Sequence, residues 1–200
     1  ADTTGSAGGA IDITETSSSS LTLLNELLTD GGTISVVKGA GDVKIGLVTT
    51  DALFGTGAGT RADVTLEATT GSLNDHDDDI VIDIYGDNVD LFGATGIGGN
   101  SGANAPADTN DPQQAIELSA NTLVLGGGGS LGIRADVPDM DFGPWDTGGA
   151  DLFLGITGNL DIIGLIESAG GDIEFGADEG ISFILPTPPG GSFDVPSDNV

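Results

Sequence analysis

Short runs that alternate apolar and polar residues recur along the whole of this 200-residue chain, and they constrain its fold more than any other feature. Clear examples are residues 10–14, 33–37, 63–68, 88–91 and 172–175. A period of two is the signature of a β-strand with one face buried. Gly, Asn or Asp usually separates one run from the next, as expected of turns. The pattern therefore predicts an all-β chain of many short strands.

Residues 21–28 allow two interpretations. In a helix, Leu21, Leu24 and Leu28 would share one face, with Ser20 as the N-cap and Gly31 at the stop. The same eight residues also form a plausible strand followed by a turn. We favour the strand.

A loose repeat underlies the strands. The segments that begin at Asp63, Asn88 and Asp172 align without gaps, and in each a glycine stands eight residues after the first. Shorter copies begin at Asp42 and Asp151. Asp, Asn and Gly tolerate the left-handed backbone of a tight corner, so the repeat indicates strand, corner, strand.

Two all-β architectures accommodate this repeat. A parallel β-helix (β-solenoid) with short irregular coils is the prediction, because the core must be aliphatic: the chain has seven Phe, one Tyr and one Trp. An antiparallel β-sandwich or jelly roll is the alternative, although clear hairpin signals are missing. We expect one domain over 1–185, with loop excursions near 99–113 and 136–149, and an extended tail over 186–200. The side chains expected to point inward are Val64, Leu66, Val89, Leu91, Ile173 and Phe175.

Four segments of the sequence carry a family resemblance. "GDVKIG", "ADVTLEATTGSLND", "GDNVDLFGATGIGG" and "AIELSANTLVL" resemble the filamentous-haemagglutinin-like repeats of large bacterial surface and secreted adhesins. The resemblance covers about residues 30–185 and implies a right-handed parallel β-helix at the cell surface. Residues 136–150 have no counterpart in the family pattern. Within them, we interpret Trp145 as a cap over an open end of the β-helix; the other interpretation is a platform on which a sugar stacks.

The charge balance excludes several classes of partner. The chain has 32 acidic and 4 basic residues, a net charge of −28, so it lacks the basic patch that nucleic acid or anionic lipid requires. No apolar run is long enough to cross a bilayer, so membrane insertion is not expected. The chain has no Cys and one His, which removes thiol chemistry and His-rich metal sites. This composition is typical of an extracellular or bacterial cell-surface protein.

Calcium is the candidate cofactor, because Ca²⁺ takes six to eight oxygen ligands and this chain is rich in Asp. The first candidate site is the alternating set Asp75, Asp77 and Asp79, for which a solvated acidic turn is the other interpretation. Weaker candidates are Asp136, Asp139 and Asp141, and the group Asp108, Asn110 and Asp111. No residue is predicted to be catalytic.

The sequence therefore predicts a non-catalytic structural or adhesive segment that associates with copies of itself or with neighbouring repeats. Cell-surface glycans are a further candidate partner. The alternatives are a carbohydrate-active β-helix enzyme and a calcium-dependent carbohydrate-binding module. Carboxylate pairs for glycoside hydrolysis are plentiful, but four basic residues leave little to receive an anionic polysaccharide.

Overall fold

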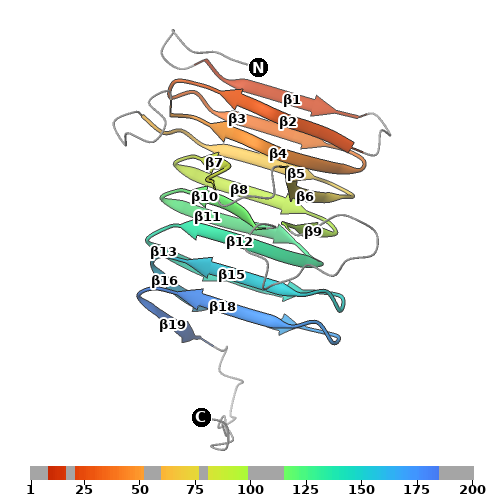
Figure 1. Ribbon diagram of the computed structural model, residues 1–200, viewed down its shortest axis with the longest axis vertical. Helices are drawn as coiled ribbons and strands as arrows, with labels where there is room; N and C mark the ends of the chain where they lie inside the picture. The colour runs from red at the N-terminus through yellow and green to blue at the C-terminus, as the bar shows by residue number, and fades with distance from the viewer. Residues whose placement is uncertain (1–8, 17–20, 52–59, 77–80, 99–114, 185–200) are drawn as a thin grey trace, which may run out of the picture.

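The computed structural model describes residues 9–16, 21–51, 60–76, 81–98 and 115–184, and these residues form an all-β structure without a helix. Every strand pairing among them is parallel. Figure 1 shows the strands stacked below one another along the long axis, with β1 (Ile11–Glu15) at one end and β19 (Gly180–Phe183) at the other. The prediction of an all-β chain is confirmed, and the antiparallel alternative is wrong for this part of the chain. We call the paired strands together the stack.

The first sheet contains five strands in sequence order. They are β1 (Ile11–Glu15), β3 (Ile34–Lys38), β5 (Val64–Ala68), β8 (Asn88–Gly93) and β11 (Thr122–Gly127). Between each of these strands the chain crosses to the second sheet and returns. Parallel strands require such crossovers, because a tight hairpin can join only antiparallel neighbours.

The second sheet has nine strands, ordered β10-β7-β4-β6-β9-β12-β15-β18 with β2 paired to β4. Its members are β2 (Leu21–Leu28), β4 (Asp42–Thr49), β6 (Ser72–Asp75), β7 (Ile84–Tyr85), β9 (Gly96–Ile97), β10 (Ile116–Ser119), β12 (Ser130–Asp136), β15 (Leu152–Ile156) and β18 (Ile173–Ala177). Two small sheets complete the stack toward its C-terminal end. One contains β13 (Asp139–Phe142), β16 (Asn159–Ile162) and β19 (Gly180–Phe183), and the other pairs β14 (Trp145–Asp146) with β17 (Ile166–Glu167).

Residues 21–28 form the strand β2, which confirms that interpretation over the helix. The strand pairs with β4 along its length, and Leu24 and Leu27 are buried next to Ile45 and Val48. The pairing places these leucines in the core, whereas an isolated eight-residue helix has little stability of its own.

The core lies between the sheets and consists of aliphatic ladders in register. Val64, Leu66, Val89 and Leu91 are at most 1% exposed, as predicted. Phe175 is partly buried against the core. Ile173 is 39% exposed, so its expected burial is wrong. It stands directly next to the buried Leu152, but β18 is the last strand of its sheet among the described residues, so no further strand covers it.

Residues 136–149 are not a loop excursion, which corrects the expectation for this segment. β12 runs to Asp136, and β13 and β14 follow as paired strands. Trp145 is a core residue and not an end cap: its ring centre lies 5.9 Å from that of Phe142, and its Nε1–H donates to the Gly129 carbonyl at 2.9 Å. The expected excursion at 99–113 and the tail at 186–200 lie outside the described residues.

Candidate functional site

Between β4 and β12 of the second sheet, two short strands lie end to end where one long strand would be expected. This happens twice in succession, first with β6 and β7 and then with β9 and β10. β4 is long, and it is followed by the first two short strands: Val43 pairs with Leu73 of β6, and Val48 pairs with Ile84 of β7. At the next level β9 and β10 replace one strand in the same way. β12 then restores a continuous strand, because it pairs with both of them. We call this interruption the sheet break.

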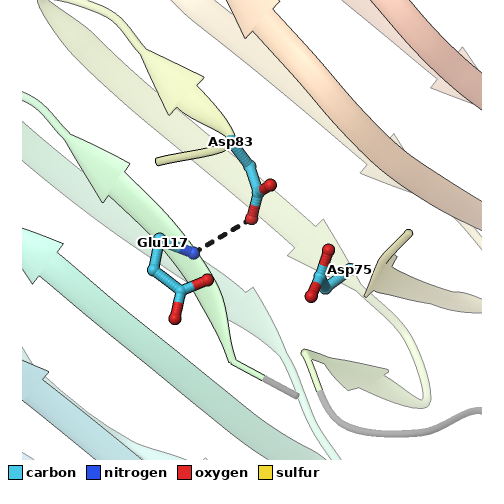
Figure 2. A group of neighbouring side chains, drawn as sticks. All are labelled: Asp75, Asp83 and Glu117. Carbon is cyan, nitrogen blue, oxygen red and sulfur yellow. Dashed lines mark hydrogen bonds between the residues drawn. The ribbon is translucent and has the colours of Figure 1, made fainter. Parts of the chain in front are cut away.

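Three buried carboxylates meet at the sheet break. Asp75 ends β6, Asp83 immediately precedes β7, and Glu117 lies in β10; they are 6%, 5% and 5% exposed. One carboxylate oxygen from each lies within 4.8 Å of the other two (Figure 2). The backbone joins two of them, because the Glu117 N–H donates to Asp83 Oδ2 at 3.1 Å and the Asp83 N–H donates to the Glu117 carbonyl at 2.8 Å.

This geometry determines what the cluster can do chemically. Carboxylates held this close repel one another when all are ionised, so a cation or shared protons would lower the electrostatic free energy. Carboxylate oxygens are the ligands that hard cations such as Ca²⁺ prefer. Within the described ranges, this is the one group of three or more His, Cys, Asp or Glu side chains close enough to share a metal ion.

Of the calcium ligands predicted from the sequence, one belongs to this cluster and several lie outside the described residues. Asp75 belongs to it, whereas Asp77 and Asp79 lie outside the described residues, as do Asp108, Asn110 and Asp111. Sequence reasoning missed Asp83 and Glu117. Asp83 precedes β7 and Glu117 lies in β10, but nothing local in the sequence brings residue 117 beside residue 75.

Asp136, Asp139 and Asp141, the weaker candidates within the described residues, are exposed and do not gather into one group. Asp136 accepts hydrogen bonds from the hydroxyls of Ser119 at 3.3 Å and Thr157 at 3.0 Å. Asp139 accepts one from the Asn159 amide at 2.9 Å. Asp141 lies two residues further along β13. The carboxylates of Asp136 and Asp139 therefore connect neighbouring strands of the stack, and the three carboxylates do not form a group that could share a metal ion.

None of the described segments is a helix that could cross a membrane. Comparison with protein-family models, with curated proteins and with solved structures found no match.

Proposed function

We propose that this chain is a segment of right-handed parallel β-helix that serves as a stiff, non-catalytic structural or adhesive unit at a bacterial cell surface. The all-parallel pairing, the alternation of the chain between two sheets and the short aliphatic ladders support the β-helix. The family resemblance of its repeats supports the surface location. Stacked parallel strands bury one continuous core, and such a stack transmits force along its length.

The C-terminal end of the stack carries this proposal. In β19, Ile181 pairs with Leu160 and Phe183 pairs with Ile162, so both continue the buried ladder of β16. Yet Ile181 is 39% exposed and Phe183 is 65% exposed. Together with Ile173 of β18, they form an apolar end surface, which we call the end face.

The end face is a template for further strands. β18 and β19 each pair on one side only among the described residues, which leaves a row of backbone donors and acceptors for strand addition. At the other end, β1 and β2 also pair on one side, and β2 exposes Leu21 and Leu23. A second copy, or the neighbouring coils of a longer chain, would extend both sheets in register. The net charge of −28 opposes this contact until salt or divalent cations screen it.

Light scattering over a protein concentration series tests the proposal. We expect association that increases with NaCl and more steeply with CaCl₂, and that a chelator reverses. Ile181→Glu with Phe183→Glu should reduce association, because it places charge on the end face while changing only exposed side chains. Val124→Glu, on the outer side of β11, is the matched control and should leave association unchanged. A protein that stays monomeric at high concentration with calcium present would contradict the proposal.

A further inference from the structure

A hollow on the outer face of the second sheet lies over two glycines. Arg134 of β12 pairs with Gly155 of β15, which pairs in turn with Gly176 of β18. These three positions form one outward-facing column, in which side chains are missing at the second and third places. A cavity of about 570 Å³ lies there, lined by Arg134, Asp136, Phe153, Thr157 and Asp178 among others. This volume is within the usual range for small-molecule sites. We call it the glycine trough.

An aromatic ring and a guanidinium form one wall of the trough. The Phe153 ring lies beside the trough floor, so that a Cβ placed on Gly155 would meet its Cζ at 3.2 Å. The guanidinium carbon of Arg134 lies 5.4 Å from the ring centre, in cation–π contact. Arg134 forms no salt bridge with any carboxylate of the described ranges, although carboxylates outnumber cations eightfold in this chain. Arg134 lies in register beside Glu117 of β10, and its Nε–H has no hydrogen-bond partner within the described part of the chain, so this donor is available to a ligand.

Hydrogen-bonding groups form the opposite wall. Asp136, Thr157 and Asp178 follow one another on successive strand levels, each one residue beyond a paired position of β12, β15 or β18. Asp136 accepts two hydrogen bonds from hydroxyl groups, and a carboxylate has about four acceptor sites, so it retains capacity for more. The wall thus offers carboxylate acceptors and the oxygen of a hydroxyl that already donates its proton to Asp136.

The chemistry of the two walls together favours one class of ligand. One side presents a flat apolar ring and the guanidinium donors of Arg134, and the other presents acceptors at the spacing of adjacent strands, about 4.8 Å. A pyranose ring has an apolar face and a rim of hydroxyls, each of which donates and accepts, so it matches both walls. An anionic ligand is disfavoured, because Glu117, Asp136 and Asp178 all line the trough and the whole chain is strongly negative.

We infer that the glycine trough is a binding site for neutral saccharides, with Phe153 as the stacking platform and Arg134, Asp136 and Asp178 as hydrogen-bonding partners of the hydroxyls. The inference is independent of the proposed association, because the trough lies on the side of the stack and the end face is not part of it. Several trough-lining groups recur along the stacking axis, so an oligosaccharide would run parallel to that axis.

The test uses an array of neutral oligosaccharides, namely cello-, manno-, galacto- and chito-oligosaccharides, with sialylated glycans and oligogalacturonate as anionic comparisons. Binders are then titrated by calorimetry. We expect neutral oligosaccharides to bind, and Phe153→Ala to weaken binding tenfold or more while Phe153→Tyr retains it. Gly176→Val should abolish binding by filling the trough. Its folding should be preserved, since a Cβ there meets its nearest neighbour, the Gly155 Cα, at 3.9 Å and valine favours strands.

Val124→Thr on β11, far from the trough in the first sheet, should leave saccharide binding unchanged. The inference is overturned by an array on which no neutral saccharide binds, or on which only the anionic glycans bind. It is equally overturned if Gly176→Val folds and binds as the parent does.

Discussion

Pairs of Asn and Asp stabilise the corner where the chain enters the first sheet. The Asn88 side-chain amide donates to Asp63 Oδ1 at 2.6 Å, and that of Asn121 donates to Asp87 Oδ1 at 2.6 Å. Further along the stack, Asn159 donates to both Asp139 at 2.9 Å and Glu179 at 3.2 Å. In an in-register parallel stack, identical carboxylates would stand over one another and repel. At these positions an Asn beside a carboxylate replaces that repulsion by a hydrogen bond.

Tyr85 gives a residue-scale prediction, because it is the only tyrosine in the chain. Burial raises its pKa above the ordinary value of 10.0. The nearby guanidinium of Arg61, 5.6 Å from the ring centre, lowers the pKa in part, while Asp136 and Asp51 raise it further. A raised folded-state pKa means that Tyr85 contributes stability below about pH 10 that is lost as pH rises through the folded-state pKa.

We therefore expect the near-ultraviolet titration of tyrosinate in the folded protein to lie above that of free tyrosine. Arg61→Gln should move the titration higher still, because it removes the one favourable charge beside the phenolate. Lys44→Gln, a cation that Tyr85 does not contact, is the control. Titration of the folded protein at or below the value for free tyrosine would contradict the assignment.

At the scale of elements, the sheet break is where three buried carboxylates meet. Ca²⁺ binding to the folded state alone would raise the melting temperature by mass action. At low salt we expect millimolar CaCl₂ to raise the melting temperature of the parent more than that of the double variant Asp83→Asn, Glu117→Gln. The double variant Asp136→Asn, Asp139→Asn is the control, since those carboxylates lie outside the cluster.

MgCl₂ at the same concentration separates calcium binding from screening, because Mg²⁺ demands octahedral geometry and dehydrates reluctantly. An equal rise with both ions, or an undiminished calcium effect without the Asp83 and Glu117 carboxylates, would reduce the effect to general screening.

The core ladder of the first sheet gives a second element-scale prediction. Leu91 of β8 is fully buried between Leu66 of β5 and Leu125 of β11, its partners in register. Leu91→Ala should lower the free energy of unfolding by about 2–5 kcal/mol, because it removes buried methyl groups and leaves a cavity between stacked strands. Denaturant unfolding measures this change. Val124→Ala on the exposed face of β11 should change it by no more than about 0.5 kcal/mol, and a similar small loss for Leu91→Ala would disprove the inward ladder.

At the scale of the whole molecule, repulsion dominates the electrostatics. Among the described residues one cation, Lys38, forms a salt bridge, in which its Nζ lies 3.0 Å from Glu15 Oε2. With 32 acidic and 4 basic residues, screening removes far more repulsion than attraction.

The melting temperature should therefore rise as NaCl increases from low to physiological ionic strength, before any association sets in. Differential scanning calorimetry at a protein concentration where scattering reports a monomer measures this rise. KCl at equal ionic strength is the control for ion-specific effects. A melting temperature that falls with either salt would show that specific ion pairs, and not net repulsion, govern stability.

Local pattern was sufficient to predict much of this protein. Period-two alternation identified strands such as β3, β5 and β8, and it placed Val64, Leu66, Val89 and Leu91 in the core. These predictions hold because a strand's pleat determines which side chains share a face. Where the local signal was broken by Pro138 and Pro144, as around β13 and β14, the same reasoning mistook paired strands for a loop.

Tertiary structure alone decided the features that depend on register between distant strands. The meeting of Asp75, Asp83 and Glu117 depends on two interruptions of one sheet at the same place. The glycine trough depends on Gly155 and Gly176 falling in one column with Arg134. The exposure of Ile173 depends on its position at the end of the stack, although its alternation is the same as that of buried residues. A sequence records which residues alternate within a strand, whereas pairing between strands determines what stands beside them.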